Sequence, residues 1–227
     1  MNEAQSNNTP QFSSVKMLRS MVGIGIMCAL IIVLTFQGTY SRIEQNKKEA
    51  LQKAIFNVLP GIQNTISYSW NEEQKFSILS DQEDSDEKVF AGFDSNGEFV
   101  GVAIEASGQG YADIITILYG YDPIEEEIIG FQVLASKETP GLGDKIEKDE
   151  NFLSNFDALD VSLSDNKTEL KNKVISVKSG MKNNPWEVDG ITGATISSRA
   201  IANIIASSSG YWGPKIYVGQ KQMKAKN

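Results

Sequence analysis

An uncharged stretch near the beginning of the chain restricts its fold more than any other feature. Residues 20–41 contain no charged side chain, and residues 21–36 are almost entirely apolar. As a helix, the uncharged stretch is about 33 Å long, enough to cross the hydrocarbon core of a bilayer. A cleaved signal peptide is the alternative, but no Ala-x-Ala-like site follows. We therefore predict one retained transmembrane helix over residues 16–41.

The rest of the chain divides around this helix. Residues 1–15 are polar and predict a disordered tail. Residues 42–61 predict a linking helix with one apolar face, ended by Pro60-Gly61. The face consists of Leu51, Ala54, Ile55, Val58 and Leu59. Residues 62–213 are enough for one domain with a substantial core, and residues 214–227 predict a basic, loose tail.

Composition excludes several classes of site. The 21 basic and 29 acidic residues give a net charge of −8, which argues against binding to nucleic acid. There is no histidine, and the only cysteine is Cys28, inside the apolar stretch. These absences exclude Ser–His and Cys–His nucleophile pairs, Cys₄ iron–sulfur clusters, histidine-ligated haem and the usual zinc sites. A redox role would need a cofactor held without histidine or cysteine, and flavin meets that requirement.

Two antiparallel hairpins are predicted in the middle of the chain. The first pairs residues 89–93 with 99–106 across Asn96-Gly97, a strong hairpin signal. The second pairs residues 113–120 with 128–135, and apolar residues on both faces of its strands predict a sheet covered on both sides. The fold class is therefore α+β, with antiparallel hairpins and packed helices.

The remaining segments are less regular. Residues 107–111 read as a flexible connection, and residues 62–87 give no clear pattern beyond an acidic, solvated loop at 81–87. A helix is expected near 144–156 and a strand at 172–179. A second helix is expected from Ile196 to about residues 207–210.

A glycine-bearing turn precedes that last helix. It reads Asp189-Gly190-Ile191-Thr192-Gly193-Ala194-Thr195, with further hydroxyls at Ser197 and Ser198. The first turn of a helix offers free backbone N–H groups and the positive end of the helix dipole, which suit a phosphate. For Thr-Gly-Ala-Thr alone, an ordinary helix cap is the alternative. The longer pattern, acid-x-x-Ser/Thr-Gly-Ala-Thr, would occur by chance in about one chain in a thousand of this length.

This pattern resembles the signal at which a flavin transferase esterifies the last threonine, here Thr195, with flavin mononucleotide (FMN). The chain thereby resembles the FMN-binding domain family, whose members include the C subunit of the sodium-pumping NADH:quinone reductase and the G subunit of the Rnf complex. The resemblance implies that Thr192, Gly193 and Ala194 surround the phosphate, together with Ser197, Ser198 and the first helix amides. Asp189 would hydrogen-bond turn amides or be read by the transferase; the sequence leaves both open.

A second motif supports the same family. Glu138-Thr139-Pro140-Gly141-Leu142-Gly143 by itself predicts a structural turn. It also resembles the family's second signature, a loop that lies against the bound FMN, and residues 143–147 resemble the Rnf member more than its quinone-reductase counterpart. Family members often carry histidine just before the glutamate, whereas residues 135–137 here are Ala-Ser-Lys. Lys178 would reach a phosphate or the flavin edge.

The resemblance implies a membrane-anchored flavoprotein that relays electrons in a complex coupling ferredoxin:NAD⁺ electron transfer to ion movement. It implies covalent FMN on Thr195, other membrane subunits and a flavin transferase as partners, and no catalytic residue beyond the flavin. We expect a single-pass protein of the bacterial cytoplasmic membrane with its domain on the periplasmic side, although the flanking charges do not decide orientation. The corresponding FMN-domain component of a sodium-pumping quinone reductase and a flavin-free anchored adaptor are the alternatives.

Overall fold

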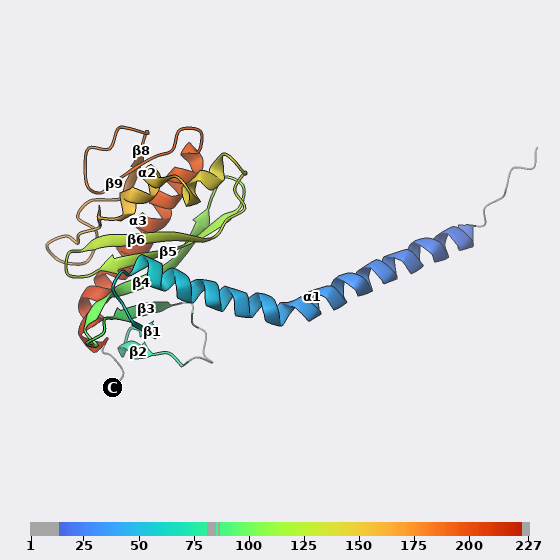
Figure 1. Cartoon of the computed structure of the whole chain (residues 1–227), viewed down its shortest axis with the longest axis horizontal. Coiled ribbons are helices and arrows are strands. Elements are labelled where there is room, and N and C mark those ends of the chain that lie inside the picture. Colours follow the sequence, from blue (N-terminus) through green and yellow to red (C-terminus); the bar gives the residue numbers. More distant parts are fainter. Residues whose placement is uncertain (1–13, 81–84, 86, 224–227) are drawn as a thin grey trace, which may run out of the picture. The chain divides into compact units, whose positions relative to one another are not determined.

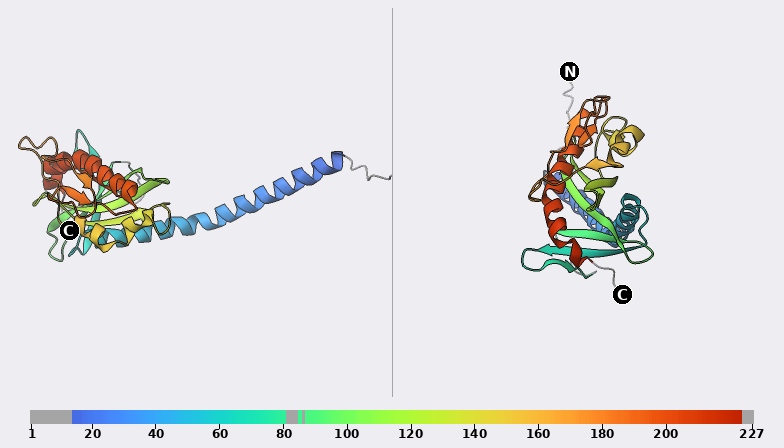
Figure 2. Two further views of the ribbon diagram at one scale, coloured as in Figure 1. Left: turned by 90° about the horizontal axis from the view of Figure 1, so that it is seen from above. Right: turned by 90° about the vertical axis from the view of Figure 1, so that its left-hand side faces the viewer.

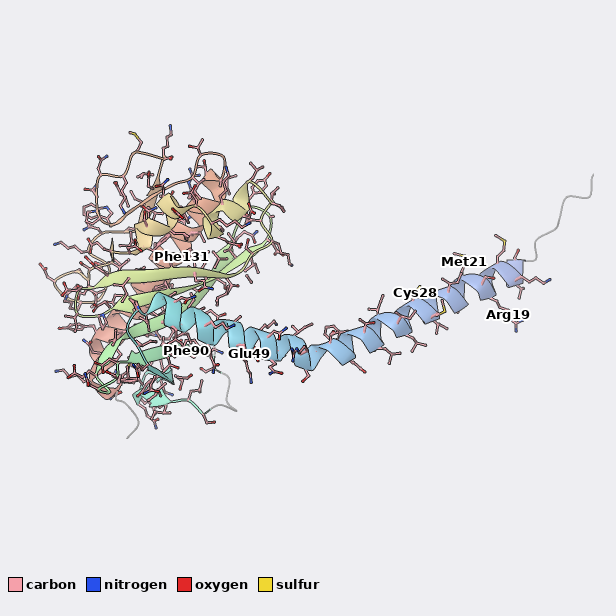
Figure 3. All side chains as sticks on the ribbon, viewed as in Figure 1. Arg19, Met21, Cys28, Glu49, Phe90 and Phe131 are labelled. Carbon is pink, nitrogen blue, oxygen red and sulfur yellow. The ribbon has the colours of Figure 1, made fainter. Side chains whose placement is uncertain are left out.

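The computed structural model describes residues 14–80, 85 and 87–223, and divides the chain into two units, residues 1–49 and 50–227. The first unit contains most of helix α1 (Ser14–Val58). Within the described ranges, α1 is the one helix long and apolar enough to cross a membrane. Its large apolar side chains in this unit are exposed, and Figure 3 labels Met21 among them. The predicted tail lies outside the described residues, except for its last two positions, which are helical.

The second unit is built on one antiparallel sheet of seven strands. Its spatial order is β2-β1-β3-β4-β5-β6-β7 (Figure 1). The strands are β1 (Asn64–Asn71), β2 (Lys75–Ile78), β3 (Lys88–Phe93), β4 (Phe99–Gln109), β5 (Ile114–Asp122), β6 (Glu127–Ala135) and β7 (Leu159–Asp160). The two predicted hairpins are confirmed as β3–β4 and β5–β6. The first turns at Gly97, whose φ is +78°.

Helices cover both faces of this sheet, as predicted. Helix α3 (Thr195–Gly219) lies on one face and the end of α1 on the other, as the right-hand view of Figure 2 shows. Side chains along β3 alternate accordingly: Val89 and Ala91 join the α3 side, and Phe90, labelled in Figure 3, joins the α1 side.

The end of α1 comes very close to the sheet. Four of the five predicted apolar positions in this segment, at 54, 55, 58 and 59, are buried. Gly120 and Gly130 are paired in register on β5 and β6, and a side chain on either would collide with the backbone of Val58. The sheet therefore accepts the helix end because two neighbouring positions lack a Cβ. The helix ends at Val58, just before Pro60-Gly61, as expected.

The last helix is longer than predicted. Helix α3 continues past residues 207–210 to Gly219 with Pro214 inside it, and a 3₁₀ turn, η3 (Gln220–Gln222), follows. The apolar stripe continues through Trp212 and Ile216, which are buried in the core, so the Ser/Gly-rich stretch does not end the helix. The prediction of a loose tail from residue 214 is therefore wrong up to Met223, which is buried.

Three other predictions need correction. The helix expected at 144–156 is divided into η1 (Gly143–Glu147), α2 (Glu150–Leu153) and η2 (Ser154–Phe156). The strand expected at 172–179 is reduced to β8 (Ile175–Val177), which pairs in parallel with β9 (Glu187–Asp189) in a separate two-stranded sheet. Residues 107–109 extend β4 instead of forming a flexible connection.

Residues 62–87, which show no clear sequence pattern, contain β1 and β2. Most of the acidic segment 81–87 lies outside the described residues. Its last residue, Glu87, accepts a hydrogen bond from the Tyr211 hydroxyl and pairs with Lys215 at 3.4 Å, so this residue is tied to α3.

Candidate functional site

The threonine-bearing turn is fixed to the start of α3. The N–H of Ala194 donates to the carbonyl of Ile191 at 3.0 Å, and Gly193 has a φ of +87°, as a type II turn requires. The Ser198 hydroxyl accepts from the N–H of Ile191 at 3.0 Å and donates to the carbonyl of Ala194 at 2.9 Å. Thr195 is the first residue of α3. The turn and the helix start therefore form one hydrogen-bonded unit.

Only some of the predicted hydroxyls are accessible. Thr192 and Thr195 are exposed, whereas Ser197 and Ser198 are buried. The Ser197 hydroxyl donates to a carboxylate of Glu138, and Ser198 is used by the turn. The structure thus presents two threonine hydroxyls to solvent and turns both serine hydroxyls into the protein.

Asp189 faces a neighbouring loop. Both of its carboxylate oxygens accept from the N–H of Gly180, at 2.8 and 2.9 Å, and one also accepts from Met181 at 3.3 Å. Asp189 therefore does hydrogen-bond backbone amides, but those of residues 180–181 and not those of the threonine-bearing turn.

The backbone of Asp189 is held by Asn155, a residue that the sequence analysis missed. The Asn155 side chain accepts from the N–H of Asp189 at 2.9 Å and donates to its carbonyl at 3.2 Å. Asn155 is 3% exposed, and its neighbour Phe156 stacks on Phe131 of β6 with ring centroids 4.2 Å apart. One more asparagine in a polar segment carries no sequence signal of this kind.

The second motif forms a matching turn. The N–H of Leu142 donates to the carbonyl of Thr139 at 3.1 Å, and Gly141 has a φ of +78°, so Pro140-Gly141 occupies the centre of a type II turn. Residues 139–142 are exposed, whereas Glu138 and Gly143 at the two ends of the motif are buried.

Glu138 joins the two motifs directly. Its Oε2 accepts from the Ser197 hydroxyl at 2.6 Å, and its Oε1 accepts from the N–H groups of Tyr111 and Ala112 at 2.8 and 3.0 Å. Segments that are far apart in the sequence therefore meet at one carboxylate. The Tyr111 side chain is exposed beside this contact.

Charged groups around the two turns form pairs. Lys137 pairs with Asp113 at 2.6 Å, and Lys148 pairs with Asp144 at 2.7 Å. The hydrogen bond from each lysine is the main cause that lowers the pKa of its aspartate. Lys178 follows β8 and is exposed, and the structure gives its ammonium no ion-pair partner within residues 14–80, 85 and 87–223.

A polar cavity of about 200 Å³ lies on the Asp189 side of the threonine-bearing turn. It is lined by Lys145, Asp149, Asn151, Phe152, Ser179, Asp189, Gly190, Ile191 and Thr192. Neither Thr195 nor any residue before Lys145 contributes to it. The surface around Thr195 is therefore separate from this cavity.

Residues 110–208, which include both turns and Tyr111, match the model of the FMN-binding domain family. Solved structures share the fold: NqrC of Shewanella oneidensis is 17% identical with a TM-score of 0.57, covering 75% of this chain and 97% of that one. The C subunit of the Na⁺-translocating NADH-quinone reductase from Parabacteroides distasonis is 22% identical with a TM-score of 0.57, covering 77% of this chain and 96% of that one.

Curated relatives extend the likeness beyond this domain. The G subunit of the ion-translocating oxidoreductase complex of Methanosarcina acetivorans is 28% identical over 196 residues, which cover 86% of this chain and 93% of the relative. The protein of the same name from Buchnera aphidicola is 30% identical over 171 residues, covering 74% and 77%. Both alignments cover far more than the FMN-binding domain match, and the chain therefore belongs to the family of G subunits of ion-translocating oxidoreductase complexes.

Proposed function

We propose that this chain is the FMN-carrying subunit of an Rnf-type ion-translocating oxidoreductase complex and relays electrons between neighbouring subunits. Family membership and the FMN-binding match support this assignment. The observation that carries it is the exposed Thr195 at the head of α3, beside the exposed loop 139–142. When bound, FMN supplies the redox chemistry, and the protein sets its position and surroundings.

Thr195 would carry FMN through a phosphoester to its hydroxyl oxygen. The residues present fit a phosphate at this place. Thr195 begins a 25-residue helix, whose first N–H groups and dipole favour negative charge. Gly193 has open space, since a Cβ there would meet nothing within 4 Å. Lys178 would add positive charge, because Val177 before it is hydrogen-bonded to the N–H of Gly190 at 3.1 Å.

Apolar side chains would support the flavin ring. Tyr111, Leu142 and Ile196 are 65%, 52% and 53% exposed. Each is next to a residue that contacts Glu138 or is itself bonded to it, so the three belong to one region of the surface. An exposed set of large apolar groups is typical of a binding surface, and a planar aromatic ring system matches it.

Helix α1 would anchor the protein in the bacterial cytoplasmic membrane, through residues 16–41, with residues 62–213 as the FMN-binding domain on the periplasmic side. The supporting observations are the length and the uninterrupted apolar surface of the helix. Other membrane subunits of the complex and a flavin transferase would be the partners. A role as the C subunit of a sodium-pumping quinone reductase remains the second candidate, because the solved structures of this fold carry that name.

Co-expression with an active flavin transferase tests the proposal. The wild-type protein should fluoresce in a denaturing gel, and peptide mass mapping should find FMN minus one water on the Thr195 peptide. Thr195→Ala should abolish the adduct, whereas the matched Thr192→Ala variant, which also removes an exposed threonine hydroxyl, should retain it. Thr195→Ser keeps a hydroxyl and should be labelled in part.

An adduct that persists in Thr195→Ala would show that another residue carries the flavin. A wild-type protein without any adduct, made beside an active transferase, would favour the flavin-free adaptor and refute the flavoprotein assignment.

A further inference from the structure

Glu138 is a buried carboxylate whose hydrogen bonds all go to the protein. It is 6% exposed, and its two oxygens accept three hydrogen bonds, from Tyr111, Ala112 and Ser197. A charged group of this kind is stable inside a protein only when such donors replace the lost water. With both oxygens used in this way, the side chain is oriented toward protein groups and away from a ligand on the surface.

Two glycines make room for this carboxylate. A Cβ on Gly110 would lie 2.5 Å from Oε1 of Glu138, and a Cβ on Gly143 would lie 2.5 Å from Oε2. Neither glycine has a positive φ, so the lack of a side chain, and not an unusual backbone, is what the structure uses. This gives a physical reason for a glutamate at the start of the Glu-Thr-Pro-Gly-Leu-Gly motif and a glycine at its end.

The three segments that meet at Glu138 each present one large apolar side chain. Tyr111 donates its N–H to the carboxylate, Leu142 precedes Gly143, and Ile196 precedes Ser197. Their exposed side chains are the same ones that we assign to the flavin ring. Without Glu138, the loop at 110–112 and the start of α3 would lose a shared attachment point, and their apolar side chains would vary in relative position.

We propose that Glu138 is a positioning residue of the FMN site and not a ligand of FMN: it holds three segments together so that flavin attached at Thr195 rests against a preformed apolar surface. This inference rests on the proposed function. It predicts that loss of the Glu138 contacts alters the surroundings of the flavin while leaving the attachment at Thr195 in place.

Glu138→Gln and Ser197→Ala test this role in the full-length protein. Glutamine keeps the shape of the side chain, but it accepts more weakly and its NH₂ group cannot accept from Ser197. The matched controls are Glu147→Gln, an exposed carboxylate beyond the same loop, and Ser207→Ala, an exposed serine of α3. The unlabelled protein is examined by amide hydrogen exchange, and the FMN-labelled protein by visible spectrum, fluorescence anisotropy and redox potential.

In unlabelled Glu138→Gln, the two amides that donate to Glu138 should exchange about tenfold faster than in the wild type. After labelling, both test variants should carry one FMN, with lower flavin anisotropy and a shifted spectrum and potential, while the controls match the wild type. Ser197→Ala removes only a hydroxyl, so it keeps the test decisive if Glu138→Gln does not fold.

Labelled, folded variants with the wild-type flavin spectrum, anisotropy and potential would overturn the positioning role, even if amide exchange is faster. If the wild type and Glu147→Gln take up no FMN beside an active transferase, the proposed function itself fails, and the positioning role falls with it.

Discussion

Asn155→Ala should destabilise the domain, because this side chain fixes the strand that leads into the threonine-bearing turn. The amide is almost fully buried and serves three backbone groups: the N–H and carbonyl of Asp189, at 2.9 and 3.2 Å, and the carbonyl of Phe152, at 2.9 Å. Alanine leaves all three without this partner. A buried donor or acceptor left unsatisfied costs about 1–3 kcal/mol, and water entering the space offsets part of the sum, so we expect a loss of roughly 2–4 kcal/mol.

Tryptophan fluorescence during thermal unfolding measures this loss in the full-length protein. All three tryptophans, at positions 70, 186 and 212, lie in the unit formed by residues 50–227, so the signal reports on that unit. For a domain of this size, each kcal/mol lowers the midpoint by about 2–4 °C, which gives a decrease of roughly 5–15 °C. Asn151→Ala, an exposed asparagine one turn earlier, is the matched control. A midpoint for Asn155→Ala within about 2 °C of this control would refute the reasoning.

Three further predictions concern the backbone, pH and topology. Gly193→Ala should cost about 1–2 kcal/mol, because its φ of +87° disfavours a side chain, whereas Gly210→Ala, inside α3 and 3.8 Å from Leu170, should stabilise by about 0.5–1 kcal/mol; equal shifts in thermal midpoint would contradict this. The N–H of Asn183 is the main cause that holds the pKa of Glu187 below its ordinary 4.5. Its stabilisation is therefore present above that pKa and lost as pH falls, so Glu187→Gln should be less stable than the wild type at neutral pH, with a difference that shrinks by about pH 3 and does not grow. Protease added to cells with a permeabilised outer layer should remove the FMN-binding domain; digestion only after the cytoplasmic membrane is opened would reverse the proposed orientation.

The sequence determined the features that depend on local pattern. The uncharged stretch predicts the membrane-length helix, Asn96-Gly97 marks the β3–β4 turn, and apolar residues on both faces of β5 and β6 require a sheet with two covered sides. The two motifs were also recognisable, because the chemistry of attachment needs particular residues at fixed spacing. Each of these signals lies within a few turns of the chain.

Only the tertiary structure decided where the side chains of those motifs point. Glu138 reads as a residue of the flavin loop, yet it faces inward, because its best donors come from segments 26 and 59 residues away. Asn155 shows no pattern at all, since its importance comes from the strand end opposite it. Helix α3 extends through a stretch rich in helix-ending residues, because packing of Trp212 and Ile216 in the core outweighs their local preference. Such contacts join distant parts of the chain, and their free energy depends on the assembled fold, which no local pattern contains.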